Sequence, residues 1–305
     1  MNTKAFIMAS ITVIIWGSTF AAIRVGLQGG YSSGHLILSR YLIASALFAV
    51  YALWPGTKFR LPKKEDLLRI LVLGWVGISI YHIGVTFGEQ TVSAATAGML
   101  VSSAPIFTAL ISVFILKERM GFFGWIGLAL GFIGIGLITM ATAGPSFQIS
   151  KGSYLVLMAA VATSVLFAYQ KPLLKRYTSM ELTAYFTWAG TLPFFIFFPG
   201  LFDDIKHATM EANLSALYIG IFPTAIGYVT WAIALGAGRA GSVTSMLYIE
   251  PVVAILVAGI WLNEWPTLIS INGGAIAIAG VIVVNLLGSK HQSAAAKKPQ
   301  KFDVT

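Results

Sequence analysis

The sequence has no cysteine and little charge: only 10% of its 305 residues are charged, whereas 57% are hydrophobic. The absence of cysteine excludes disulfide bonds, thiolate metal sites and cysteine nucleophiles. A soluble domain carries roughly 25% charged residues, so this composition cannot cover a surface that faces water. We therefore expect lipid to surround most of the chain, which argues against a soluble enzyme or a soluble binding module.

Signatures of several other functional classes are also missing. The four histidines are far apart and lack metal-ligand spacing, and no GxxxxGK[ST] motif is present to support an ATP-driven pump. We therefore expect no catalytic residues, no metal and no cofactor. The net charge of +9 would suit a nucleic-acid partner, but its distribution fits the positive-inside bias of membrane proteins, so no nucleic-acid partner is expected.

Ten apolar segments of helical length run along the chain. A membrane helix needs about 20 residues, and the segments span 5–26, 35–54, 67–87, 93–116, 121–140, 152–171, 181–200, 213–235, 241–262 and 267–287. We predict an all-α integral membrane protein with ten transmembrane helices. The transmembrane domain covers 1–288, and the polar stretch 289–305, rich in Lys and Ala, is predicted to be a disordered cytoplasmic tail.

The positions of Lys and Arg predict the orientation of the chain. With both termini in the cytoplasm, 16 of the 20 Lys and Arg residues fall on the cytoplasmic side, three on the outer side, and Arg40 lies within a helix. Cytoplasmic loops carry an excess of these residues. We predict a multi-pass protein of the inner (plasma) membrane with cytoplasmic N- and C-termini. Long basic side chains near helix ends can reach the membrane surface, as we expect for Arg40 and Lys171.

The sequence matches itself without gaps at an offset of 146 residues. Matched pairs include Tyr31 with Tyr177, Glu65 with Glu211, Gly74 with Gly220, Pro105 with Pro251 and Glu118 with Glu264. The two repeats, 1–142 and 147–288, hold five predicted helices each, and an odd number makes the second copy enter the membrane from the opposite side. We predict two inverted repeats around a central cavity, as in many secondary transporters.

Short motifs in the first, fourth and ninth predicted helices give a family resemblance. They are Ile15-Trp16-Gly17-Ser18-Thr19-Phe20, then Pro105 with Lys117-Glu118, and Tyr248-Ile249-Glu250-Pro251 with Asn263-Glu264. The chain resembles the drug/metabolite transporter superfamily, and within it the ten-helix EamA family of metabolite exporters, over about residues 5–288. The resemblance implies a basket-like fold in which helices 1, 3, 4, 6, 8 and 9 surround a cavity and helices 5 and 10 lie at the periphery. It also implies export of amino acids or their derivatives, while other members handle nucleosides, sugars or drugs.

Polar and aromatic side chains follow one face of six predicted helices at steps of three and four residues. We expect these faces to line a substrate cavity, with ordinary helix packing as the alternative. Aromatic walls with few polar groups suit a small amphipathic solute, and rings also attract an ammonium group. The candidates are Trp16, Thr19, Ser79, His82, Thr86, Ser102, Ser103, Phe167, Gln170, Tyr228, Trp231, Tyr248 and Glu250.

Two prolines and one carboxylate stand out within the apolar segments. Proline removes a helical hydrogen bond, so Pro105 and Pro251 are candidate hinges, with a static kink as the alternative. Glu250 is predicted near the middle of the hydrocarbon core, where a carboxylate costs about 2.5–3.5 kcal/mol. It either binds a substrate ammonium group, exchanges a proton or supports the kink. Glu118 and Glu264 are expected to cap a helix or to pair across the repeats.

Together these features favour a secondary transporter that exports a small organic metabolite by alternating access. An amino acid or a derivative is the first substrate class, and drug-like cations, nucleosides and sugars are alternatives. A membrane channel would need a continuous polar pore or an oligomeric ring. An intramembrane enzyme would need a nucleophile–base pair or metal ligands, and only His82 and Glu250 offer any such chemistry. Proton coupling is one hypothesis, and the oligomeric state stays open.

Overall fold

The computed structural model describes residues 3–115, 120–141, 150–170, 172–237, 243 and 245–284, and every regular element in these ranges is helical. The α-helices are α1 (Thr3–Gln28), α2 (Ser33–Leu53), α3 (Lys64–Gly74), α4 (Tyr81–Gly88), α5 (Ala94–Val101), α6 (Ala104–Phe114), α7 (Phe122–Ala141), α8 (Lys151–Tyr169), α9 (Ser179–Thr191), α10 (Leu201–His207), α11 (Met210–Ile219), α12 (Gly227–Ala237), α14 (Glu250–Leu262) and α15 (Leu268–Val283). The π-helices are η1 (Trp75–Ile80) and η4 (Gly220–Ile226), and the 3-10 helices are η2 (Leu173–Lys175), η3 (Leu192–Phe197) and η5 (Ser245–Ile249). Lys117, Glu118, Lys171 and the tail 289–305 lie outside the described residues.

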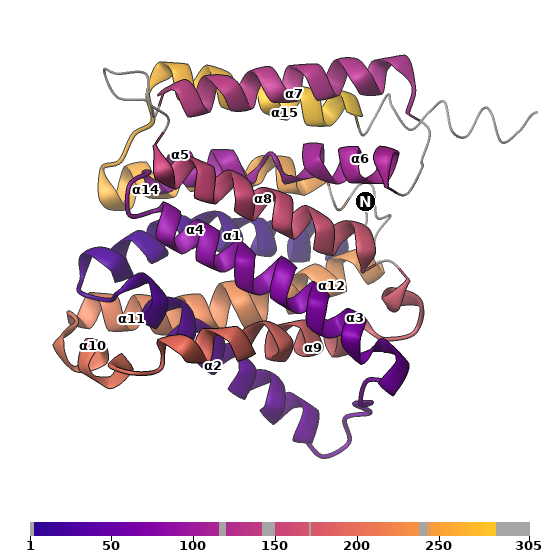
Figure 1. The fold of residues 1–305 in the computed structure, drawn as a ribbon, viewed down its shortest axis with the longest axis vertical. Helices are drawn as coiled ribbons and strands as arrows, with labels where there is room; N and C mark the ends of the chain where they lie inside the picture. The colour runs from indigo at the N-terminus through magenta and orange to yellow at the C-terminus, as the bar shows by residue number, and fades with distance from the viewer. Residues whose placement is uncertain are drawn as a thin grey trace, which may run out of the picture.

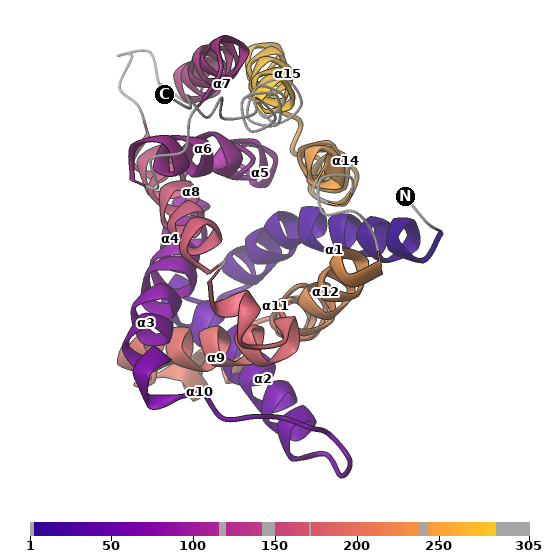
Figure 2. The ribbon, with the colours of Figure 1, turned by 90° about the vertical axis from the view of Figure 1, so that its right-hand side faces the viewer.

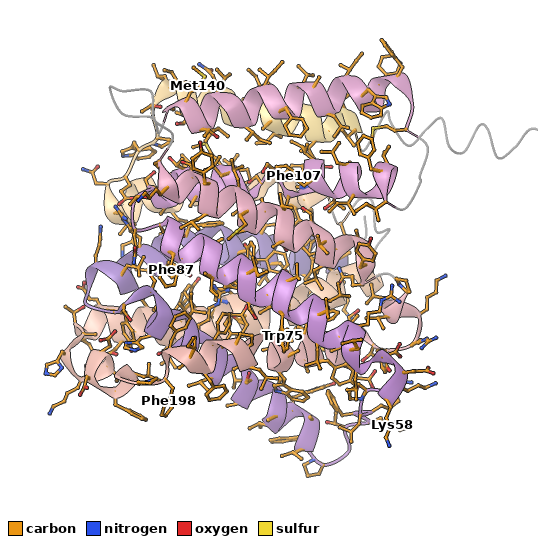
Figure 3. The ribbon with its side chains drawn as sticks, in the orientation of Figure 1. Lys58, Trp75, Phe87, Phe107, Met140 and Phe198 are labelled. Atoms are coloured by element: carbon orange, nitrogen blue, oxygen red, sulfur yellow. The ribbon has the colours of Figure 1, made fainter. Side chains whose placement is uncertain are left out.

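The described helices have the length and apolar composition of membrane-crossing segments. Seven stretches could each cross a bilayer, and an eighth joins α9–η3 to α10 through a bend of 83°. The helical stretches Met246–Leu262 and Leu268–Val283 are apolar but shorter. Large apolar side chains are exposed on the outside, as at Met140 on the outer side of α7 (Figure 3). The all-α class is confirmed, and the composition is that of an integral membrane protein.

Helices from the two halves of the chain pack in matching ways. In the first half, α1 packs against α12 and α14, which belong to the second half; in the second half, α8 packs against α4 and α6 of the first. Adding 146 residues to α4 and α6 gives the positions of α12 and α14. In Figures 1 and 2, α7 and α15 lie side by side at one end of the long axis, and they contact α5 and α6.

Individual contacts repeat at the same offset. A Cβ atom added to Gly74 would meet Ala189, and one added to Gly220 would meet Ile43. Gly220 follows Gly74 by 146 positions, and Ala189 follows Ile43 by the same number. The pairs are therefore equivalent, with the roles of the two halves exchanged.

One hydrogen bond joins two residues that are themselves equivalent. The hydroxyls of Ser45 and Thr191 lie 2.9 Å apart, and the residues are separated by 146 positions. The π-helices η1 and η4 also occupy equivalent places, because η4 begins 145 residues after η1. Equivalent residues can touch only where the two copies meet, so Ser45 and Thr191 lie at the boundary between the copies.

The two ends of the helices are tied together by different sets of polar contacts. At one end, Arg60 pairs with Glu181 at 2.9 Å and Arg176 pairs with Asp66 at 3.0 Å. Burial raises the pKa of the Tyr177 hydroxyl, which therefore stays protonated and donates to Asp66 at 2.8 Å. These contacts join the segment before α3 and the first turn of α3 to the segment between α8 and α9 and the first turn of α9.

At the other end, the connection between α1 and α2 meets the connection between α10 and α11. The Thr209 N–H donates to the Gly29 carbonyl at 2.8 Å, and the Ser32 N–H donates to Asp204 at 2.8 Å. The same Asp204 carboxylate pairs with His35. Lys58 lies at the end opposite to α10 (Figures 1 and 3).

Glycines bring the backbones of α7 and α15 into direct contact. A Cβ atom on Gly127 would lie 2.6 Å from the carbonyl oxygen of Gly280, and one on Gly134 would lie 2.5 Å from that of Gly273. These distances are too short for any side chain. Small residues allow such close approach between membrane helices, so the pair depends on glycine at these four positions.

We expect Gly134→Val to destabilise the protein by about 1–3 kcal/mol, because the new side chain must push α7 and α15 apart. The matched control is Gly136→Val on the same helix, where an added Cβ atom meets nothing within 4 Å. Thermal unfolding of the purified protein in detergent measures both. Equal melting temperatures for the two variants would contradict the close packing of this pair.

Candidate substrate-binding site

A cavity of about 130 Å³ lies where α1, α2, α4, α6, α8, α12 and α14 approach one another. An apolar cavity of about 150 Å³ in another protein holds benzene, so this space accepts a small organic molecule. Its walls are largely apolar or aromatic with a few polar groups, the usual character of a small-molecule site. The lining residues that matter below are Trp16, Thr19, Arg40, Tyr81, His82, Ser102, Pro105, Thr163, Phe167, Pro223, Tyr228, Tyr248, Glu250 and Pro251.

A second cavity of about 120 Å³ adjoins the first. The two share four lining residues, Trp16, Thr163, Phe167 and Tyr228. The second cavity is also lined by residues near the Arg176 end, among them Leu174 and Ser179. The shared aromatic residues therefore separate the first cavity from the second, which lies closer to the Arg176 end of the helices.

The predicted site residues fall into three groups. The first cavity is lined by Trp16, Thr19, His82, Ser102, Phe167, Tyr228, Tyr248 and Glu250, together with both prolines, Pro105 and Pro251. The second cavity is lined by Gln170 and Trp231, and again by Trp16, Phe167 and Tyr228. Neither cavity is lined by Ser79, Thr86 or Ser103.

The side chains of Ser79 and Ser103 are used in packing. The Ser79 hydroxyl donates to the Gly190 carbonyl of α9 at 2.8 Å, and the Ser103 hydroxyl donates to the Leu100 carbonyl at 2.6 Å. Thr86 is buried in α4. Ser79 lies in the π-helix η1, whose wider turn rotates the faces that follow, so a stripe drawn with the ordinary helical period does not stay on one face.

Trp16 forms the wall between the two cavities. Its indole N–H donates to the Pro223 carbonyl at 3.0 Å. Its ring lies 5.4 Å from the Tyr228 ring and 5.5 Å from the Trp231 ring, centroid to centroid. Aromatic pairs at these separations stabilise one another beyond their burial, so the wall is held from both α1 and α12.

The π-helix η4 contains a proline, Pro223. Pro223 has no N–H, so in an ordinary helix the Ile219 carbonyl would lose its donor. The Thr224 hydroxyl donates to that carbonyl instead, at 2.9 Å. The same hydroxyl oxygen accepts a hydrogen bond from Arg40 Nε at 2.7 Å. The proline thus places a hydrogen-bond partner for a buried arginine.

Arg40 was expected at the membrane surface, and this prediction is wrong. The residue is only 5% exposed and lines the first cavity. Its Nη1 atom is buried and has no hydrogen-bond partner among the described residues. The sequence signal was present, because an arginine stood six residues inside an apolar segment. Its partner, Thr224, lies 184 positions away and could not be recognised from the sequence.

Both prolines occupy the first turn of a helix and do not interrupt one. Pro105 lies in the first turn of α6 and Pro251 in the first turn of α14. Proline is tolerated there, because the first N–H groups of a helix have no intrahelical acceptor. The expected loss of a helical hydrogen bond is therefore wrong. The interruption precedes each proline, at the Ser102–Ser103 turn and at η5, and a hinge role stays a prediction.

Glu250 opens α14 and lines the first cavity. Within the described residues its carboxylate makes neither an ion pair nor a hydrogen bond with another side chain. Arg40 lines the same cavity and forms no ion pair there either. An acidic side chain and a guanidinium group therefore border one space without forming an ion pair with each other.

Glu264 closes the end of the helices that also holds Gly29 and Asp204. Its carboxylate pairs with Arg24 Nε at 2.9 Å and accepts from the Ala94 N–H at 3.1 Å. Ala94 begins α5, so Glu264 both caps a helix and pairs with the first half of the chain. The predicted capping and pairing roles of Glu264 are both found in the structure.

Comparison with known proteins agrees with this arrangement. The model of the EamA-like transporter family matches residues 3–140 and again residues 150–286. The chain belongs to the EamA-like transporter family. The uncharacterized transporter YdfC of Bacillus subtilis (strain 168) is 36% identical to this transporter over 289 residues, 95% of this chain and 93% of its own.

Two further comparisons cover nearly all of this EamA-like transporter. A protein of Streptantibioticus cattleyicolor named "Probable terminal-alkyne amino-acid exporter" is 38% identical over 293 residues, 95% of this chain and 97% of its own. A solved structure described as "Crystal structure of protein" is 19% identical and superposes with a TM-score of 0.63, covering 94% of this chain and 99% of that one. At this identity, the solved structure and this chain are shown to share a fold and nothing further.

We expect cysteine substitutions to separate cavity residues of this transporter from packing residues. The natural sequence has no cysteine, so each single cysteine reports alone. Ser102→Cys should react readily with a small methanethiosulfonate reagent, because Ser102 lines the first cavity. The matched control, Ser79→Cys, should react slowly, because Ser79 is 3% exposed. Mass spectrometry measures the rate of labelling. Faster labelling of Ser79→Cys than of Ser102→Cys would contradict this assignment.

Proposed function

We propose that this protein is a secondary transporter that exports a small organic metabolite by alternating access, with an amino acid or a derivative as the substrate class. The observation that carries the proposal is the first cavity, which has aromatic walls and is bordered by an acidic side chain and a guanidinium group that form no ion pair with each other. A ring face and a carboxylate both attract an ammonium group, which gives Glu250 the role of ammonium partner. The name of the Streptantibioticus relative, an amino-acid exporter, supports the same class.

The architecture that we propose is ten transmembrane helices in two inverted repeats. Its support is the double match to one family model, over 3–140 and 150–286. Further support comes from the contacts that recur at an offset of 146 residues, such as the pair Ser45–Thr191. In inverted-repeat transporters the substrate site lies at the interface of the repeats. Here the first cavity is lined from both halves of the chain.

Ion pairs lie at both ends of the proposed transport path, and the second cavity extends towards one of these ends. Arg24, Glu264 and the start of α5 are joined by the contacts described above. The second cavity extends from the shared aromatic wall towards the Arg176 end. This asymmetry supports one state of an alternating-access cycle, whereas a channel requires one path open to both sides.

Exchange measurements in proteoliposomes test the function. With purified protein and panels of amino acids, nucleosides, sugars and drug-like cations, we expect unlabelled amino acid inside the vesicles to accelerate uptake of the same labelled amino acid. A carrier returns faster when it is loaded on both sides, which explains the acceleration. Flux that rises linearly with concentration and shows no acceleration would indicate a pore. Acceleration by nucleosides, sugars or cations alone would reject the amino-acid class.

We also propose that the protein lies in the plasma membrane with both termini in the cytoplasm. This places Lys58 inside and Lys206 outside. We expect Thr57→Cys to resist a membrane-impermeant maleimide in intact cells, and Lys206→Cys to react. After permeabilisation both should react. Labelling of Thr57→Cys from outside would reverse the orientation, since cytoplasmic loops carry the excess of Lys and Arg.

A further inference from the structure

We propose that Arg40 is the residue that binds the carboxylate group of the transported solute and so determines specificity. This inference rests on the proposed function and assigns a role to one side chain within it. A guanidinium group keeps its charge in proteins and presents a planar fork that matches a carboxylate in a bidentate geometry. The first observation is that Arg40 has such a group in a place where water cannot easily solvate it, at 5% exposure.

Arg40 differs from three other arginines in the described part of the chain. Arg24 pairs with Glu264, Arg60 with Glu181, and Arg176 with Asp66. Arg40 has no carboxylate partner among the described residues, although it is the most deeply buried of the four. Buried charges are normally paired. The buried Glu89 carboxylate interacts with Arg40 through space but forms no ion pair with it, so Nη1 has no anion in contact among the described residues.

The surroundings hold the guanidinium in one orientation. Nε is fixed by the Thr224 hydroxyl at 2.7 Å, and Cζ lies 5.8 Å from the centre of the Tyr41 ring. Nη1 is left without an acceptor. The Arg40 guanidinium is held through Nε while Nη1 has no acceptor. Binding of a ligand at Nη1 would therefore cost little side-chain entropy.

A second polar residue stands beside this position. Both ring nitrogens of His82 are buried without a hydrogen-bond partner, and His82 lines the same cavity as Arg40. The His82 ring packs edge-on against Tyr41 and Tyr81, with centroids 4.9 and 4.6 Å away. An imidazole N–H can donate to a carboxylate oxygen that the guanidinium leaves free.

The cavity also fixes the kind of acid. Apolar residues such as Ile23 and Val85 line the same cavity as Arg40, so the carboxylate must belong to a molecule with an apolar body. Glu250 borders the same space and forms no ion pair with Arg40, which leaves the arginine free for the ligand. A small monocarboxylate with an apolar body is the chemistry that meets these conditions.

The test compares ligands that differ in one charged group. The probes are leucine and phenylalanine, their amides, which lack the carboxylate, and 4-methylpentanoate and 3-phenylpropanoate, which lack the ammonium group. Binding is measured as the ligand-dependent rise in melting temperature of the purified full-length protein. For the native protein, we expect carboxylate-bearing probes to stabilise more than the matched amides.

Arg40→Gln should weaken binding of the carboxylate probes by about 10- to 100-fold, the usual range for loss of a charged hydrogen bond, and should remove their advantage over the amides. Arg40→Lys keeps the positive charge but loses the planar fork, so its affinity for the carboxylate probes should lie between those of the native protein and Arg40→Gln. It also serves as the test variant if Arg40→Gln does not fold. Arg176→Gln makes the same charge change at the far end of the helices and should keep the advantage.

Three outcomes overturn the assignment. They are equal stabilisation by acids and amides in the native protein, stabilisation by none of the carboxylate probes, and an unchanged advantage in Arg40→Gln. Failure of the proposed function looks different, because amino acids would then give no accelerated exchange in vesicles even where carboxylate probes bind and Arg40→Gln abolishes that binding. An amino acid that exchanges well in Arg40→Gln would leave the function intact and remove the role of Arg40.

Discussion

Backbone N–H and C=O groups have no water to bond to inside a bilayer, and this constraint decides where the helices can be irregular. Non-helical backbone is tolerated at membrane depth only where it is buried in protein or lines a cavity. Four interruptions obey this rule. The turn at Ser102, the π-helix η4 with Pro223 and the 3-10 helix η5 with Tyr248 line the first cavity, and η1 with Ile78 lines the second. These four irregular segments therefore line the cavities, whereas the 3-10 helix η3 lines neither of them.

The repeated scaffold carries chemistry that is not repeated. Arg40 of the first half corresponds to Phe186 in the second, and Glu250 of the second half corresponds to Ala104 in the first. The two copies thus supply equivalent helices, kinks and close contacts, while each charged group exists once. Equivalent backbones place the two charges at different points of one cavity, which makes its walls chemically unlike although the architecture is nearly symmetric.

Much of the helical pattern could be predicted from the sequence, because apolar runs of membrane length and glycine spacing are local signals. The α7–α15 pair illustrates this, since its glycines recur at matching positions. The stripe through Ser79 failed because η1 changes the number of residues per turn, and no residue in the sequence announces a π-helix. The surface position expected for Arg40 failed for another reason. Its burial depends on Thr224, whose hydroxyl is placed by Pro223 in a segment far along the chain.

Close packing and open space are distributed unevenly, and this limits which parts can move. The backbones of α7 and α15 touch through Gly127, Gly134, Gly273 and Gly280, so sliding between these two helices would force atoms together. The cavity walls contain turns, 3-10 and π segments whose hydrogen bonds are already non-standard. Rocking of one repeat against the other, as proposed for transport, is therefore compatible with a fixed α7–α15 pair only if the displacement is taken up around the cavity.

The ion pair between Arg24 and Glu264 joins the two halves across one end of that cavity. Any movement that opens this end must separate those charges, so the exposure of the cavity there is coupled to the loss of a specific contact.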